Sequence, residues 1–365
     1  MKRPGRSTPG LPLALLLAAC LPDPLDEGSS GDALLLPGET ESSDDHGERV
    51  EYETDDTDET DETEGETEDV CGDGIVGATE ECDVANLFQP CNPDCTSDDC
   101  YWNLAAAPLP AKIHADSQYG EIAFDSNCDL IITGAKTQTL YRLSHVDGTV
   151  SAVGNIAADS INSLTAHVDG RLYIGVSTPN QIWALELDDS LTKVADIPAN
   201  PHGMTSAPAV FGGLGSHLIW GADAGKVYAT NPVAGTTTIV GSFGNGVFSD
   251  VAFGPDGTLY VGEHMSARIR TLTADGVFSL FADLPSVIDG LIVDPAGTAL
   301  HVASYAGGES IDSLSIPGAV KTEGPAVFLN GGSWPTGMVF DSSGRLLHLT
   351  GIGIDGGAAI DSFVP

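Results

Sequence analysis

The sequence of residues 101–365 predicts an all-β fold, a six-bladed β-propeller, preceded by a disordered acidic tether and a small disulfide-rich module. Three observations predict the propeller. The sequence has an internal period of about 40 residues, its apolar runs are short and separated by turns that carry Asp-Gly or a related pair, and helical periodicity is absent. The 44 glycines of the chain suit the many tight turns that such a fold requires.

Six units of this kind can be aligned, each with an apolar strand, a turn and a second apolar strand. The paired runs are 121–125 with 129–132, 163–166 with 169–175, 203–205 with 217–221, 250–253 with 256–262, 290–294 with 298–303, and 337–341 with 344–349. The last unit stops early. Residues 101–115 could supply its missing outer strand, which would close the ring and remove two sheet edges.

Residues 1–19 have the pattern of a secretory signal, with a basic head followed by an apolar run. The run ends in Leu-Ala-Ala before Cys20, which resembles the lipobox of bacterial lipoproteins. That resemblance implies that Cys20 is acylated and anchors the chain in a membrane; the alternative is an ordinary cleavable signal. By the same resemblance Leu21, in place of aspartate, favours the outer membrane or cell surface of a bacterial envelope.

Residues 20–70 read as a tether, because 21–70 hold 21 acidic side chains against one basic residue, Arg49. Such a segment cannot bury enough apolar surface to offset chain entropy, so we expect disorder. It supplies about half of the net charge of −39. In residues 101–365, ten basic residues stand against 25 acidic ones, which would repel a phosphate backbone and argues against nucleic acid as a partner.

Residues 71–100 hold five of the six cysteines that follow Cys20. The pattern Cys-Gly-Asp-Gly-Ile-Val, then Glu-Glu-Cys-Asp, then two late cysteines resembles the myxococcal cysteine-rich repeat of surface proteins. The Ala-Thr at 78–79 and the stretch 84–89 depart from that pattern. About 30 residues cannot close a hydrophobic core unaided, so such modules depend on crosslinks.

The cysteines of an exported chain are expected to form disulfides. Cys71, Cys82, Cys91 and Cys95 would make two bridges whose pairing the spacing does not reveal. Cys100 and Cys128 then remain as partners, linking the module to the first strands of the large domain. Zinc binding is the rival interpretation, since three residues separate Cys91 and Cys95.

The large domain resembles the six-bladed propeller superfamily of NHL-repeat proteins and gluconolactonase-like lactonases, on the phrases Ile-Asp-Gly-Leu-Ile-Val-Asp (288–294) and Ala-Phe-Gly-Pro-Asp-Gly-Thr-Leu-Tyr-Val (252–261). In those lactonases, the residue before the first glycine of an inner strand lines the central channel, and a Glu, an Asn and an Asp there hold a divalent cation. The equivalent positions here are Gly120, Asn162, His202, Ser249, Asp289 and Thr336.

The resemblance implies a calcium or other divalent-metal site built from Glu121, Asn162, Asp250 and Asp289, with His202 as a candidate catalytic base. The lactonase motif of Glu before Gly-Pro is missing. Glu121 lies one residue beyond the channel position, and a one-residue shift turns a side chain to the opposite face of a strand. The alternative for His202 is a histidine hydrogen-bonded within a loop, and for the aspartates a role in turns.

Two hypotheses about function follow. The first is a non-enzymatic, lipid-anchored envelope protein, expected to be a monomer, whose propeller binds a protein, glycan or small molecule. The second is a calcium-dependent lactonase-like hydrolase. A G-x-G-x-x-G string at 351–356 has no strand-to-helix context, and neither a G-x-S-x-G elbow nor an H-E-x-x-H helix occurs, so nucleotide binding, serine hydrolases and zinc proteases lack support.

Overall fold

The computed structural model describes residues 100–110, 113, 120–134, 137–304, 310–321, 333–352 and 357–363. All of them belong to the second of two units of the chain, Glu64–Pro365. The predicted signal segment, Cys20, the acidic tether and the cysteines at 71, 82, 91 and 95 lie outside the described residues. Among the described residues, no helix has the length and apolar character needed to cross a membrane.

The strands of the described residues form six antiparallel sheets, each built from strands that follow one another along the chain. The first sheet contains β1 (Ile122–Phe124), β2 (Leu130–Gly134), β3 (Thr139–Leu143) and β4 (Val150–Asn155). The second contains β5 (Ser160–Ala166), β6 (Leu172–Ser177), β7 (Gln181–Leu185) and β8 (Leu191–Asp196). The third contains β9 (Pro201–Ser206), β10 (Leu218–Ala222), β11 (Lys226–Asn231) and β12 (Thr236–Ser242).

The fourth sheet also has four strands, β13 (Phe248–Phe253), β14 (Leu259–Glu263), β15 (Arg268–Leu272) and β16 (Phe278–Asp283). The fifth and sixth sheets have three described strands each. The fifth contains β17 (Ile288–Val293), β18 (Ala299–Ser304) and β19 (Ser310–Ser315), and the sixth contains β20 (Ser333–Phe340), β21 (Leu346–Ile352) and β22 (Gly357–Phe363). Two 3₁₀ turns, η1 (Gly212–Leu214) and η2 (Asp223–Gly225), flank β10.

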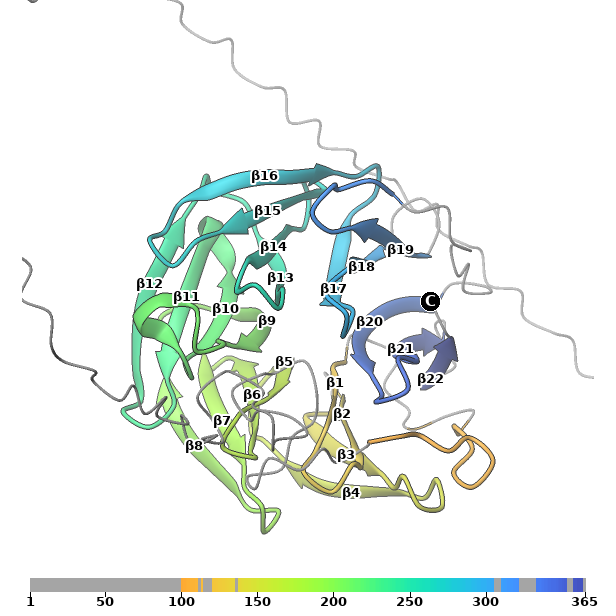
Figure 1. The fold of residues 1–365 in the computed structure, drawn as a ribbon. Coiled ribbons are helices and arrows are strands. Elements are labelled where there is room, and N and C mark those ends of the chain that lie inside the picture. Colours follow the sequence, from red (N-terminus) through yellow and green to blue (C-terminus); the bar gives the residue numbers. More distant parts are fainter. Residues whose placement is uncertain are drawn as a thin grey trace, which may run out of the picture. The chain divides into compact units, whose positions relative to one another are not determined.

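The sheets surround a common axis, so the fold is an all-β propeller (Figure 1). The first strand of each sheet is the innermost, and β1, β5, β9, β13, β17 and β20 contact one another in that order. The ring closes where β20 contacts β1. Apolar side chains that alternate along the strands fill the space between successive sheets, which is the core expected for sheets with two buried faces.

The turn between the first two strands of a sheet has a recurrent geometry. Glycine occupies its left-handed position in four sheets, at Gly170, Gly257, Gly297 and Gly344, where φ lies between 67° and 79°. In the first sheet this position is Cys128, with φ of 63°. A side chain is disfavoured in this region, yet Cys128 adopts it, as does Ser216 in the corresponding turn of the third sheet, with φ of 62°. The disulfide of Cys128 to Cys100 is present, as the sequence predicted.

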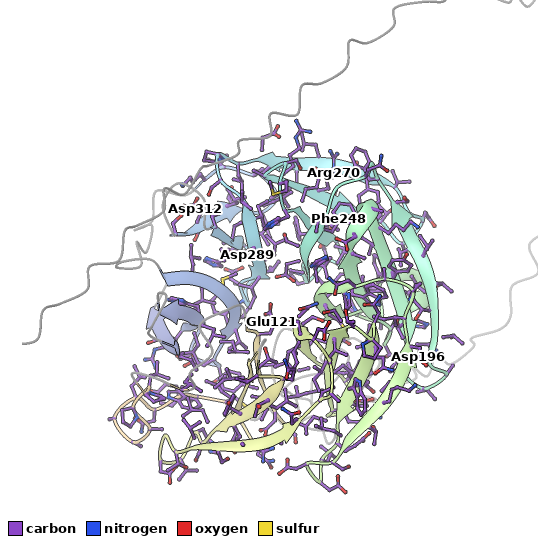
Figure 2. The ribbon with its side chains drawn as sticks, turned by 180° about the vertical axis from the view of Figure 1, so that it is seen from behind. Glu121, Asp196, Phe248, Arg270, Asp289 and Asp312 are labelled. Carbon is purple, nitrogen blue, oxygen red and sulfur yellow. A yellow bond between two sulfur atoms is a disulfide. The ribbon has the colours of Figure 1, made fainter. Side chains whose placement is uncertain are left out.

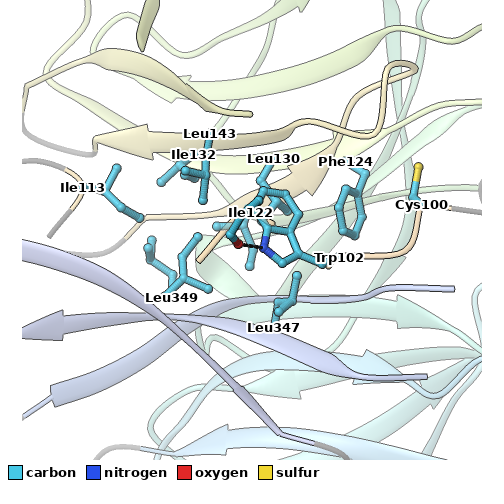
Figure 3. Close-up of a cluster of buried hydrophobic side chains, with 12 residues drawn as sticks. Cys100, Trp102, Ile113, Ile122, Phe124, Leu130, Ile132, Leu143, Leu347 and Leu349 are labelled. Atoms are coloured by element: carbon cyan, nitrogen blue, oxygen red, sulfur yellow. Dashed lines mark hydrogen bonds between the residues drawn. The ribbon is translucent and has the colours of Figure 1, made fainter. Parts of the chain in front are cut away.

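Residues 100–110 and Ile113 fill the seam between the sixth and the first sheet (Figure 3). Trp102 is fully buried there among side chains of β1, β2 and β21, and its indole Nε1 donates to the carbonyl of Ala107 at 2.8 Å. Arg345 Nη1 donates to the Trp102 carbonyl at 2.9 Å. The segment is thus tied to both sheets that meet at the seam.

The expectation that residues 101–115 form the outer strand of the last sheet is wrong for the described part of that segment, because residues 100–110 and 113 contain no strand. Two features explain the difference. Trp102 inserts between the sheets instead of pairing along an edge. Pro108 and Pro110 also lack the N–H groups that a strand ladder requires.

Candidate functional site

The inner strands line the central channel. In five of them the register of pairing with the next strand shifts at the position that the alignment of the six internal units singled out. The ladder shifts by one residue at Asn162 in β5, at Ser249 in β13 and at Asp289 in β17. It also shifts between Pro201 and Met204 in β9 and between Pro335 and Met338 in β20. Such bulges leave one residue unpaired and re-aim its neighbours. Thr336 lies in the last of these, and its side chain is outside the described set.

Glu121 and Asp250 occupy equivalent positions, each one residue after the position that the alignment of the six units singled out, Gly120 and Ser249; of these two, Ser249 lies at a ladder shift. Asp250 pairs with Gly262 of β14, and Glu121 is bonded to Thr133 of β2, whose N–H donates to its carbonyl at 3.0 Å. The sequence raised the possibility that Glu121 turns away from the channel. The structure places it on the channel lining, close to the axis (Figure 2).

A cavity of about 520 Å³ occupies one part of the channel. Glu121 and Asp250 mark its limit along the inner strands, since Asn162, His202 and Asp289, which precede that level, do not line it. Beyond these two acids its wall is mainly apolar, with residues from all six inner strands: Phe124, Leu164, Met204, Val251, Leu291 and Met338. Cavities of this size and character are typical small-molecule sites.

The other end of the cavity is formed by the first hairpin turns of the sheets, where the charged groups pair with one another. Arg171 Nη2 lies 2.6 Å from Asp169 Oδ2, and its Nη1 lies 3.5 Å from Glu186 Oε1. Burial opposes ionisation of Asp169, but hydrogen bonds from His167 and Arg171 outweigh it and lower the pKa of that carboxyl. These groups are therefore engaged in structural pairs.

Asp250 is held by backbone donors from two sheets. Its Oδ1 accepts from the N–H of Val251 at 2.8 Å, and its Oδ2 accepts from the N–H of Leu291, in the next inner strand, at 2.7 Å. Burial raises its pKa to about 7, against these two hydrogen bonds and with the added charge of Asp289. Gly203 of β9 lies against it so closely that a Cβ atom there would be 1.8 Å from Oδ1. Asp250 thus joins three neighbouring sheets.

Glu121 has a different environment. Its backbone N–H donates to Thr133 Oγ1 at 2.7 Å, but within the described residues no hydrogen bond or ion pair reaches its carboxylate. Burial raises its pKa well above the ordinary value of 4.5, and the charges of Asp250 and Asp289 raise it further. Its side chain ends at the cavity. It is an enclosed acid that the described residues leave unpaired.

Asp289 also has an oxygen without a partner. Its Oδ2 is buried and, in the part of the chain that the structure describes, accepts no hydrogen bond. Burial raises its pKa to about 6, and the nearby His264 opposes that rise. An unsatisfied buried oxygen is costly, so this position is suited to a bound group.

The other two predicted residues are engaged elsewhere. Asn162 Nδ2 donates to Asn200 Oδ1 at 2.6 Å. His202, in β9, has its Nε2 3.0 Å from Asp223 Oδ1 in η2, which differs from the alternative of a histidine hydrogen-bonded within a loop. An imidazole beside a carboxylate can accept a proton and so act as a general base. Among the described residues, however, we find no further group in contact with His202 that could exchange a proton with it.

The five residues do not form one metal site in this conformation. Among the described residues, no group of three or more His, Cys, Asp or Glu side chains is arranged to hold a metal ion. Asp250 already accepts two backbone hydrogen bonds, and Asn162 and His202 point to other partners. The donor set therefore does not fit the calcium site that the resemblance implied, and we derive no step through a metal.

Sequence reasoning did not find the cavity or the role of Gly203. The wall residues have the same apolar alternation as residues buried between sheets, so their pattern carries no signal for a cavity. Gly203 is followed by an apolar residue, as are Gly290 and Gly337 at the same position of their units, and this repeated pair is a weak signal for close packing across the channel.

Solved structures share this fold. The gluconolactonase of Xanthomonas campestris is 18% identical, with a TM-score of 0.54 over 72% of this chain and 92% of its own. Virginiamycin B lyase of Staphylococcus aureus is 15% identical, with a TM-score of 0.53 over 70% and 87%. An auxiliary nutrient binding protein of Bacteroides thetaiotaomicron is 14% identical, with a TM-score of 0.53 over 68% and 70%.

These similarities show that the chain is a β-propeller protein with a fold related to that of gluconolactonases and virginiamycin B lyase. No family description and no curated protein sequence matches it. Because one fold serves a lactonase, a lyase and a binding protein, the fold alone does not assign a function.

Proposed function

We propose that this chain is an exported, lipid-anchored envelope protein whose six-bladed propeller binds a small molecule without transforming it. The observation that carries the proposal is the apolar cavity of about 520 Å³ that ends at Glu121 and Asp250. Burying an apolar ligand surface in such a cavity stabilises a complex by roughly 25 cal/mol per Å² before the costs of association. The lipobox-like sequence before Cys20 and the acidic tether would hold this domain away from a membrane.

Binding of a neutral apolar dye, Nile red, tests whether the cavity takes up an apolar molecule. The full chain should bind the dye, and Thr205→Phe, which adds a ring to the cavity wall, should weaken binding at least tenfold. Thr238→Phe on the exposed surface of β12 is the matched control and should bind as the unchanged chain does. Equal dye binding by both variants, or no binding at all, would overturn the proposal.

The anchor is tested separately. Expressed in a bacterium with labelled palmitate, the chain should incorporate label, and Cys20→Ser should not. Label in both proteins, or in neither, would remove the membrane from the proposal.

The alternative that the resemblance implied is a calcium-dependent hydrolase. The donor set does not fit it, but the buried Oδ2 of Asp289 accepts no hydrogen bond within the described residues, which makes the alternative worth a direct test. Binding of one calcium ion per chain, together with lactone hydrolysis that Asp289→Asn abolishes, would replace the binding function with this one. Neither calcium binding nor lactone turnover is expected.

A further inference from the structure

One end of the cavity carries the carboxylate of Glu121, which has no ion pair with a described residue, and the chemistry of this group determines which ligands fit. The cavity wall is mainly apolar, with Phe124, Leu164, Met204 and Leu291 among the lining residues. A ligand therefore needs an apolar body. What remains to be matched is the carboxyl end.

The two acids at that end differ in how many hydrogen bonds the described residues already give them. Both oxygens of Asp250 already accept backbone N–H groups. The carboxylate of Glu121 accepts none within the described residues, although burial and two neighbouring acids oppose its charge. Burying a carboxylate without a partner is costly, and a partner of opposite charge removes much of that cost.

The charge of the surroundings decides the sign of the ligand. The cavity lining contains four carboxylates, at Glu121, Asp125, Asp169 and Asp250, and one basic side chain, Arg171. Arg171 is paired with Asp169 and Glu186, and Asp125 is paired with Arg142. The lining carboxylates that have no ion pair with a described residue are therefore Glu121 and Asp250. Asp289 adds a further negative charge that acts on Glu121. An anionic head group would be repelled here, and a cationic one attracted.

From this geometry we infer that the cavity takes an amphiphilic amine, with its apolar body along the wall and its ammonium group against the carboxylate of Glu121. The inference rests on the proposed function, since it names the ligand class of the same cavity. Ammonium supplies three donors and a compact charge, which matches a single carboxylate that lacks donors.

Competition against Nile red with three ligands of one chain length, dodecylamine, dodecanol and dodecanoate, tests the inference below their micelle concentrations. The full chain should bind the amine at least tenfold more tightly than the alcohol, and the acid most weakly. Glu121→Gln should bring the amine and the alcohol to within about threefold of each other while dye binding persists.

Asp196→Asn is the matched control, because it removes one negative charge from the outer edge of the propeller, far from Glu121 (Figure 2). It should keep the preference for the amine. The preference should also survive 0.5 M salt, whereas attraction to the acidic surface is screened at that ionic strength. Far-ultraviolet circular dichroism and melting temperature verify that Glu121→Gln is folded.

The outcomes separate this inference from the proposed function. Equal binding of amine and alcohol by the unchanged chain overturns the ligand class and leaves the binding cavity standing. A preference that persists in Glu121→Gln overturns it as well. If dye and all three ligands fail to bind, the proposed function itself is overturned.

Discussion

Glu121 and Asp250 are two carboxylates at the same position of two inner strands, and the structure gives them opposite environments. Each has a glycine of the preceding sheet against its backbone: a Cβ on Gly337 would lie 2.7 Å from the Cα of Glu121, and one on Gly203 would lie 2.4 Å from the Cα of Asp250. The Asp250 carboxylate accepts two backbone hydrogen bonds. The longer side chain of Glu121 reaches the cavity, and its carboxylate accepts no hydrogen bond from the described residues.

The comparison teaches that a channel carboxylate is not by itself a functional residue. Side-chain length and the available N–H groups decide whether it joins the sheets or remains open to a ligand. Asp250 is the structural member of the pair, and Glu121 is the one to which we assign the ligand.

The largest effect is expected at the glycine that packs against Asp250. Gly203→Ala places a Cβ atom 1.8 Å from Oδ1 and 2.4 Å from Cα of Asp250, and neither atom can yield because both are held in the ring. We expect a loss of about 3 kcal/mol in the free energy of unfolding. Urea unfolding measures it. Gly213→Ala, where no atom lies within 4 Å of the added Cβ, should change stability by less than about 0.5 kcal/mol. Equal effects at the two glycines would contradict the close packing.

Removal of the two carboxylates sharpens the contrast. Asp250→Ala leaves the N–H groups of Val251 and Leu291 without their acceptor, so we expect a loss of about 2 kcal/mol in stability. Glu121→Ala removes no hydrogen bond of the described residues and should cost less than about 1 kcal/mol. Thermal and urea unfolding of the two variants compare them directly. A larger loss for Glu121→Ala would reverse the assignment of roles.

The smallest effect is a pH dependence. Because the folded-state pKa of Glu121 is raised, its contribution to stability is full below its unfolded pKa of about 4.5 and declines as pH rises toward the folded value. Glutamine does not titrate, so Glu121→Gln does not lose this contribution to stability as pH rises. The variant should therefore gain stability relative to the unchanged chain between pH 4.5 and pH 8, measured by urea unfolding at several pH values. Asp250 and Asp289 titrate in both proteins. Parallel pH profiles would show that Glu121 is not enclosed.

Much of the fold could be predicted from the sequence because its signals are local. The strand pairs of each unit are separated by turns of a few residues, so the apolar runs and the turn residues specify them together. The Cys100–Cys128 link was predicted from cysteine count. The insertion of Trp102 was not, because its contacts with Asp341 and Arg345 join residues more than 200 positions apart, and no local pattern records such a pairing.

The site could be predicted only in part. Alignment of the six units found the irregular positions at Asn162, Ser249 and Asp289, but a bulge changes the direction of the next side chain, and the sequence does not show that change. The partner of Asp250 is Leu291, in the following unit, and only the assembled ring brings these two residues together.

The disulfide between Cys100 and Cys128 determines how the domain responds to mechanical load. A pull on the chain that precedes residue 100 passes through the sulfur atoms into the turn between β1 and β2. The covalent path bypasses residues 101–127, so tension does not draw Trp102 out of the seam. A force applied from that side would be carried by the disulfide bond, while the contacts that close the ring stay unloaded.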